Sequence, residues 1–240
     1  MLEFYGSIAF VESAWDCELC FAYKEVPETF MGGAPAQPEN IARHERVRAF
    51  RAKLRTHTPD QLIDEFLLTP GCHGIEAGLD AQLQEFVGNK FEVAATDVLV
   101  VGSAKTGFSI SQKIRNGRVI KPRYRSFSEE SDVDLAIVSS ALFDRIWEET
   151  FSYLNEIGPW AQIQSFEKYF FRGWIRPDKL PQEDTFRPGK TWRDFFNRMN
   201  RDRDYTDHRI SAGLYRSPLF LRAYQRVAIK ECQQEEAGLV

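Results

Sequence analysis

The chain has 240 residues, of which 43% are hydrophobic, so it is long enough for one large domain or for a catalytic domain with a modest appendage. Its 31 basic and 35 acidic residues give a formal net charge of −4, which excludes a global attraction to nucleic acids or acidic membranes. Any such binding must be local. The sequence contains no apolar run long enough to span a bilayer and lacks the layout of a secretory signal, so we expect a cytoplasmic protein without a membrane partner.

Four cysteines in a chain of this size, without a secretory signal, argue against a disulfide framework and are expected to be reduced thiols. Cys17 and Cys20 could join Cys72 and His73 in a four-ligand zinc site. An adjacent Cys-His pair is an awkward chelate, however, and no second spaced pair exists. Buried or partly exposed thiols are the commoner use of such residues, and zinc stays open as an alternative.

The N-terminal region, residues 1–73, is expected to be helical or irregular. Apolar spacing over residues 40–54 predicts a helix whose other faces are rich in arginine and lysine. Such a helix can lie along a nucleic-acid backbone, although an ordinary solvated face is the commoner reason for this pattern. A second helix is expected over residues 58–68, because Thr58 and Gln61 have the spacing of a capping box.

Two apolar strand patterns lie near the middle of the chain, and each one is joined to a distinctive polar motif. The first, residues 98–101, ends at Gly102 and Ser103. The second, residues 131–138, contains Asp132 and Asp134. Alternate side chains of a strand share a face, so these two aspartates are expected to project together while the apolar residues between them face the core.

This pair of carboxylates favours a divalent-metal site. Two neighbouring carboxylates raise each other's pKa, and a bound cation allows both to remain ionised near neutral pH. Oxygen ligands select Mg²⁺ or Mn²⁺, and magnesium is usually held by one or two carboxylates together with water and substrate phosphates. The acidic pair therefore implies a nucleotide. Beside it, Gly102 would let backbone N–H groups approach an anion, and Ser103 can donate to a phosphate oxygen.

At residues 98–138 the chain resembles the polymerase-beta-like nucleotidyltransferase superfamily. The signature of that family is an apolar strand, Gly-Ser, a further glycine, and then Ser-Asp-x-Asp-Leu opening the next strand. The residues that match it are Gly102, Ser103, Gly107, Ser131, Asp132, Asp134 and Leu135. The resemblance implies that Gly102 and Ser103 hold the β and γ phosphates of a nucleoside triphosphate such as ATP, and that Asp132 and Asp134 ligate the metals. Lys105, which lies between the two glycines, is expected to assist the departure of pyrophosphate, and Lys105, Gly107 and Ser131 complete the predicted nucleotide-binding set.

Active members of the superfamily usually add a third carboxylate on a later strand. The best strand for it here, residues 209–216, contains no acid, and Ser211 stands where the aspartate is expected. Asp207, just before this strand, is the nearest carboxylate that could substitute, and we take it as the third catalytic residue. Weaker choices are Asp202, Asp204 and Glu167. Either the third role is filled from another element, or the site works with fewer ligands, or the chain binds nucleotide without turning it over.

The connection between the two motifs, residues 108–130, is a basic insertion. The Asn116-Gly117 pair within it predicts a two-residue hairpin turn. Its basic residues are Lys113, Arg115, Arg118, Lys121, Arg123 and Arg125. Because the insertion lies between the phosphate cradle and the metal ligands, we favour a role in gripping phosphates or an incoming strand. A solvated loop without a binding role is the alternative.

Helices are further expected over residues 75–87, 143–157, 191–199 and 218–232. The third of these is predicted to begin with a capping box formed by Thr191 and Asp194. The aromatic-rich stretch 163–175 is expected to be a strand pair or an irregular lid. Its rings could stack on a nucleobase, although packing in the core is their commoner use.

The expected fold is α+β, with a small mixed or antiparallel nucleotidyltransferase sheet flanked by helices, a mainly helical N-terminal region and a C-terminal helix. The domain resembling nucleotidyltransferases is expected over residues 74–240. The resemblance implies metal-dependent transfer of an NMP or dNMP to a hydroxyl, with a nucleic-acid end or a nucleotide as the favoured acceptor and a protein side chain next. The compact size is similar to that of small bacterial nucleotidyltransferases of antiphage defence and toxin–antitoxin systems, which would imply a partner protein. The alternative is a catalytically degenerate fold that binds a nucleotide or a partner.

Overall fold

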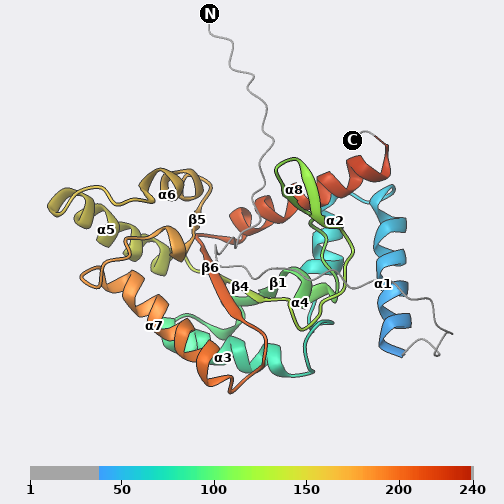
Figure 1. Cartoon of the computed structure of the whole chain (residues 1–240), viewed down its shortest axis with the longest axis horizontal. Helices are drawn as coiled ribbons and strands as arrows, with labels where there is room; N and C mark the ends of the chain where they lie inside the picture. The colour runs from blue at the N-terminus through green and yellow to red at the C-terminus, as the bar shows by residue number, and fades with distance from the viewer. Residues whose placement is uncertain (1–37, 239–240) are drawn as a thin grey trace, which may run out of the picture.

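The structure, a computed structural model, describes residues 38–238, with side chains from residue 41 onward, and has a mixed α+β fold (Figure 1). Its helices are α1 (Pro38–Leu54), α2 (Pro59–Leu62), α3 (Leu79–Phe91), α4 (Gly102–Thr106), α5 (Ser140–Glu156), α6 (Ile163–Phe170), α7 (Arg187–Asp202) and α8 (Pro218–Glu236). Single turns of other helix types are η1 (Ile63–Leu67), η2 (Ala95–Asp97) and η3 (Pro177–Lys179). The strands are β1 (Val98–Val101), β2 (Lys113–Arg115), β3 (Arg118–Lys121), β4 (Val133–Val138), β5 (Trp174–Ile175) and β6 (Ile210–Tyr215). The predicted α+β class is confirmed.

The main sheet has the strand order β1-β4-β6-β5 and is mixed. Strand β4 pairs antiparallel with β1 and parallel with β6, and β5 adds an antiparallel edge to β6. In this register Asp134 lies opposite Val101 on one side and opposite Ser211 on the other. The motifs that the sequence places on separate strands are therefore neighbours at the middle of one sheet.

The two faces of the sheet differ in what covers them. Residues Val133, Leu135 and Ile137 of β4 point into the large core that α3, α5 and α7 form on one face. Alternation along the strand puts Asp134 and Ala136 on the opposite face, where Ala136 packs in a smaller cluster that includes α8. Figure 1 shows α8 on the opposite side of the sheet from α3 and α7. The acidic residue thus lies on the less heavily covered face.

A third cluster joins the beginning and the end of the described chain. It brings α1, α2 and α8 together around Phe50, Phe108 and Ile229, all of which are almost completely buried. Basic residues of α1 form ion pairs within the same region, since Arg51 pairs with Glu236 and Lys53 with Glu65. Acidic side chains of the protein itself therefore neutralise part of the basic face predicted for this helix.

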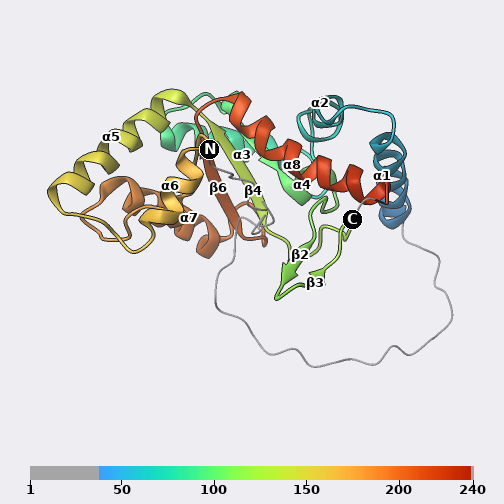
Figure 2. The ribbon, with the colours of Figure 1, turned by 90° about the horizontal axis from the view of Figure 1, so that it is seen from above.

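The predicted hairpin at Asn116-Gly117 is confirmed as the β2–β3 ribbon. Both turn residues have positive φ angles, 50° and 72°, as a two-residue turn that matches the twist of its strands requires. Figure 2 shows this ribbon projecting from the body of the molecule near the C-terminal end of α8. It forms a separate two-stranded sheet.

The helix predicted over residues 75–87 is shifted in the structure. Gly78, with φ of 86°, precedes the first turn of α3, and the helix continues through Gly88 to Phe91. Gly88 does not end the helix, because its role is close packing: a Cβ atom there would lie 3.0 Å from the backbone oxygen of Val93.

Two further expectations about helices were wrong. Helix α7 begins at Arg187 with Pro188 in its first turn, so Thr191 lies inside the helix and forms no capping box, and Asp194 instead pairs with Lys190 at 2.6 Å. The stretch 163–175 is mainly helical, as α6, rather than a strand pair or a lid.

The aromatic residues of this stretch serve chiefly in packing. Phe166, Tyr169 and Trp174 are buried, as core packing requires, while Phe171 is 90% exposed. No helix of residues 38–238 has both the length and the apolar character needed to cross a bilayer.

Candidate functional site

The candidate site begins where β1 turns into α4. Gly102 lies at this turn with φ of 66°, a conformation that glycine adopts without the strain that other residues experience. A Cβ atom on Gly102 would lie 3.2 Å from Asp134 Oδ2. The absence of a side chain therefore lets the Asp134 carboxylate approach the backbone of the Gly-Ser turn. The next residue, Ser103, is half-buried, and its hydroxyl makes no hydrogen bond to the residues that the structure describes.

Asp134 is held from the neighbouring strand. The Ser211 hydroxyl on β6 donates a hydrogen bond of 2.9 Å to Asp134 Oδ1. Burial raises the pKa of Asp134 to about 7, the hydrogen bond from Ser211 opposes this rise, and the negative charge of Asp132 adds to it. The two carboxylates are thus coupled electrostatically, and without a cation Asp134 is only about half ionised at neutral pH.

Asp132 lies immediately before the strand, because β4 begins at Val133 rather than at residue 131 as expected. A turn over residues 128–131 precedes it. In this turn the Ser128 N–H donates to Ser131 Oγ at 3.0 Å, and His208 Nδ1 lies 3.0 Å from the Ser131 carbonyl oxygen. Ser131 therefore shapes the loop that carries Asp132 toward Asp134, and its hydroxyl is engaged within that loop.

Two cationic side chains act on Asp134 besides these groups. The positive charges of Lys113 on β2 and Arg209 just before β6 both lower the pKa of Asp134, against the dominant effect of burial. Arg209 was missed in the sequence. Its signal was its position one residue before β6, the strand that lies beside β4, where its carbonyl accepts a 2.8 Å hydrogen bond from the Val133 N–H.

The structure does not bring Lys105 or Gly107 to this site. The Lys105 side chain is buried and donates hydrogen bonds to the carbonyl oxygens of Thr69 and Gly71. Gly107 is also buried and ends α4 with φ of 79°, and a Cβ atom there would lie 2.9 Å from a terminal nitrogen of Arg46. Both residues pack α4 against segments near the N-terminal end of the described chain, at Thr69 and Gly71 for Lys105 and at Arg46 for Gly107.

Asp207 does not supply the third carboxylate of the site. Its side chain is 89% exposed, and it forms a 3.3 Å ion pair with Arg203. Within residues 38–238, no group of three or more histidine, cysteine, aspartate or glutamate residues is arranged to hold a metal ion. Ser211 lies in register with Asp134 on the neighbouring strand. It stands at the position where the resemblance implies an acid. The described site therefore offers two carboxylates and a serine.

These residues fit a magnesium or manganese ion that takes much of its coordination from a substrate. The donors are carboxylate oxygens, which suit these hard cations. The raised pKa of Asp134 also marks a carboxylate whose charge the protein alone leaves poorly compensated. Phosphate oxygens and water would have to supply the other ligands.

The zinc alternative receives no argument from the structure. Cys17 and Cys20 lie outside the described residues. Cys72 is half-buried, and its burial raises the pKa of the thiol to about 11.

Part of the basic insertion is used to hold the fold. The Arg123 side chain is 6% exposed and pairs with Glu231 at 3.1 Å and Glu235 at 2.6 Å on α8. Arg125 donates to the carbonyl oxygens of Ser111 and Pro122. The sequence did not distinguish these two arginines from the other basic residues of the insertion, because the difference depends on contacts with distant or loop residues.

A group of packed aromatic side chains lies on the same face of the sheet as Asp134. The sequence analysis did not predict it there. The rings of Trp174 and Tyr215 stack with centroids 5.5 Å apart, and Tyr224 on α8 packs 4.9 Å from Trp174. The available signal was alternation, since Ser211, Gly213 and Tyr215 share one face of β6.

Gly213 provides the space for this group, because a Cβ atom there would lie 2.6 Å from Trp174 Nε1. That nitrogen is buried without a hydrogen-bond partner in the described part of the chain.

Comparisons with models of protein families, with curated proteins and with solved structures give no match.

Proposed function

We propose that the chain is a metal-dependent nucleotidyltransferase that moves an NMP or dNMP from a nucleoside triphosphate to a hydroxyl acceptor. The observation that carries this proposal is the contact between the Asp134 carboxylate and the Gly102 turn, with Asp132 close enough to raise the pKa of Asp134. An acidic pair beside a turn of backbone N–H groups is suited to a triphosphate that arrives with its divalent cation.

Each residue of the site has a distinct part in binding. Asp132 and Asp134 would hold Mg²⁺ or Mn²⁺, and the bound ion would neutralise the charge of the phosphates. The N–H groups at Gly102 and the Ser103 hydroxyl would bind the β and γ phosphates, which become the leaving pyrophosphate. Ser211 keeps the Asp134 carboxylate directed at the turn through its 2.9 Å hydrogen bond.

In the reaction, the acceptor oxygen forms a bond to the α-phosphorus while the bond from that phosphorus to pyrophosphate breaks. The acceptor loses its hydroxyl proton to solvent. The protein contributes mainly by positioning the triphosphate and by stabilising the charge of the leaving group. No third acid is needed for these binding roles, although its absence leaves no dedicated carboxylate base near the acceptor among the described residues.

The acceptor belongs to this proposal as well. A nucleic-acid end or a nucleotide is favoured over a protein side chain, because Lys113 and Arg209 place positive charge beside the acidic pair. The resemblance to small bacterial nucleotidyltransferases adds a role in antiphage defence or a toxin–antitoxin pair, with a partner protein and a cytoplasmic location.

A second function is favoured by one specific observation. Ser211, rather than an acid, faces Asp134 across the sheet, and the described residues contain no three-acid group. A degenerate site of this kind would bind a nucleotide, or a partner protein, without turnover.

The test is to incubate the purified protein with each radiolabelled NTP and dNTP in the presence of Mg²⁺ or Mn²⁺. We expect pyrophosphate release, with the label recovered in an oligonucleotide, nucleotide or protein fraction that identifies the acceptor. Asp132→Asn/Asp134→Asn should abolish release, whereas Asp97→Asn, at an exposed carboxylate beside β1, should not. Nucleotide binding with no turnover under any condition would instead establish the degenerate function.

A further inference from the structure

The β2–β3 ribbon has two chemically different faces. Cross-strand partners share a face, and in this register Lys113 pairs with Lys121 and Arg115 with Arg118. Alternation puts Lys113 and Arg115 on one side of β2, and Arg118 shares that side as the partner of Arg115. Ile114 and Val119 lie on the other side, and a bulge next to Lys113 brings Lys121 opposite it. We call the side formed by Lys113, Arg115, Arg118 and Lys121 the basic ribbon face.

This arrangement places like charges directly opposite each other, which destabilises a two-stranded sheet. The protein does little to offset it, because the only ion pair of these four residues within residues 38–238 is Lys121 with Glu130, at 3.8 Å. Arg115 and Arg118 are exposed. This concentration of positive charge therefore does not stabilise the described part of the fold.

The neighbouring arginine behaves in the opposite way. Arg123, just after β3, is buried against Glu231 and Glu235 of α8, so the base of the ribbon is fixed to the body. The ribbon itself projects from that base (Figure 2). A fixed support that presents the exposed Arg115 and Arg118 on one side is the construction expected of a binding surface rather than of a solvated loop.

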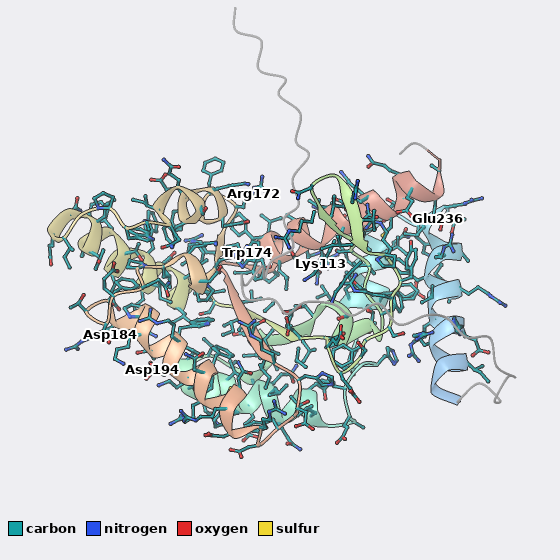
Figure 3. All side chains as sticks on the ribbon, viewed as in Figure 1. Lys113, Arg172, Trp174, Asp184, Asp194 and Glu236 are labelled. Carbon is teal, nitrogen blue, oxygen red and sulfur yellow. The ribbon has the colours of Figure 1, made fainter. Side chains whose placement is uncertain are left out.

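The basic ribbon face leads to the candidate site. Its inner pair contains Lys113, whose charge acts on Asp134, and its outer pair lies next to the turn. Lys113 is labelled near the middle of Figure 3. Strands rise about 3.3 Å per residue, so Lys113 and Arg115, one member of each pair, are about 7 Å apart along β2. Separated pairs of this kind suit a chain of repeated phosphates better than one free phosphate.

We propose that the basic ribbon face binds the sugar–phosphate backbone of a single-stranded nucleic acid and directs the end of that strand toward Asp134. That this nucleic acid is the acceptor of nucleotidyl transfer rests on the proposed function. That the ribbon face binds the nucleic acid does not. An anionic membrane is disfavoured as the occupant because the chain carries a net charge of −4, so that attraction is confined to this narrow ribbon.

The experiment measures the affinity of fluorescent single-stranded RNA and DNA 20-mers by anisotropy, without NTP or metal, from 50 to 300 mM salt. Arg115→Gln/Arg118→Gln should weaken binding about tenfold or more at low salt. It should also reduce the slope of log K against log salt by about 1.4, because each lost contact with a single strand contributes about 0.7. The matched control is Arg172→Gln/Arg198→Gln, which removes the same charge from exposed arginines after α6 (Figure 3) and on α7 and should bind as the wild type does.

The outcomes separate this inference from the proposed function. Asp132→Asn/Asp134→Asn should retain oligonucleotide binding even though it abolishes turnover. The inference is overturned if neither oligonucleotide binds at 50 mM salt, or if the ribbon variant and its control bind equally. It is also overturned if vesicles containing phosphatidylserine bind through Arg115 and Arg118 while the oligonucleotides do not. Turnover on a small-molecule acceptor without oligonucleotide binding would keep the proposed function and reject this inference.

Discussion

Asp134 is the residue at which the fold and the candidate function oppose each other. Burial raises its pKa to about 7 in the folded protein, whereas an unfolded chain would have a value near 4. Between these values the folded state binds the extra proton, so the free energy of unfolding falls as pH rises from about 4 to 7 and then stays level. The carboxylate that would ligate a cation therefore lowers the stability of the metal-free protein.

Asp134→Asn should remove this conflict. In metal-free buffer at pH 8 we expect the variant to be more stable than the wild type by about 2–4 kcal/mol, and the difference should shrink to about 0.5 kcal/mol as the pH falls to 4. Urea denaturation at several pH values measures both quantities, with Asp97→Asn as a control that should follow the wild type. A wild type and Asp134→Asn with the same pH dependence would mean that the carboxylate is not buried as described.

Gly102 sets the distance between the carboxylate and the turn. Gly102→Ala should cost about 1–2 kcal/mol of stability, because alanine is strained at a φ of 66°. The added Cβ, 3.2 Å from Asp134 Oδ2, should also weaken binding of a magnesium nucleotide. Gly78→Ala has the same kind of strain, at φ of 86°, but its Cβ has no atom within 4 Å. Calorimetric titration should thus show weaker binding only for Gly102→Ala, and equal binding by both variants would contradict the account.

At the scale of elements, the β2–β3 ribbon depends on Arg123. Replacing it with glutamine leaves Glu231 and Glu235 without their partner and removes a bond to the Ile110 carbonyl oxygen. Both glutamates are partly exposed, so we expect a loss of about 1–3 kcal/mol, below the range for a fully buried pair. Urea denaturation measures the loss. Arg118→Gln, at an exposed position of the same ribbon, should change stability by less than about 0.5 kcal/mol. An equal effect of the two substitutions would exclude the anchoring role.

Local signals in the sequence were sufficient for the elements that depend on neighbouring residues. The capping box of Thr58 and Gln61 and the Asn116-Gly117 turn were predicted because the interacting groups are a few residues apart. The start of α7 was misplaced because Thr191 has the sequence of a cap but lies inside a helix that begins at Arg187. The competing local signal was Pro188, which favours the first turn of a helix and was not used.

At the scale of the molecule, the cluster of α1, α2 and α8 joins both ends of the described chain. Phe50 is fully buried in it and contacts the rings of Phe66 and Phe108. Phe50→Ala should cost about 3–5 kcal/mol. Because Phe108 follows α4 directly, the cluster and the sheet should still unfold in one transition, as followed by both circular dichroism and tryptophan fluorescence. Two separate transitions would show that residues 38–67 are an independent unit.

The site shows the same division between local and distant information. The closeness of Gly102 and Asp134 was predictable from two strands that flank their motifs. Ser211 was noticed only as the residue at the expected place of a third acid, and its position opposite Asp134 comes from the structure. The burial of Lys105 was not predictable, because its partners are carbonyl oxygens 34 and 36 residues away in the sequence. Asp207 was chosen for nearness along the chain, but its loop directs it into solvent beside Arg203.

The central claim is that Asp132, Asp134 and the Gly102 turn together bind a triphosphate with its divalent cation. Its most direct test is calorimetric titration of Mn²⁺ with a non-hydrolysable NTP analogue into the wild type, Asp132→Asn/Asp134→Asn and Asp97→Asn. The account predicts that the wild type and Asp97→Asn bind alike, that the double variant binds at least about tenfold more weakly, and that wild-type affinity increases from pH 6 to pH 8 as Asp134 loses its proton. Equal affinity of the double variant and the wild type would contradict it.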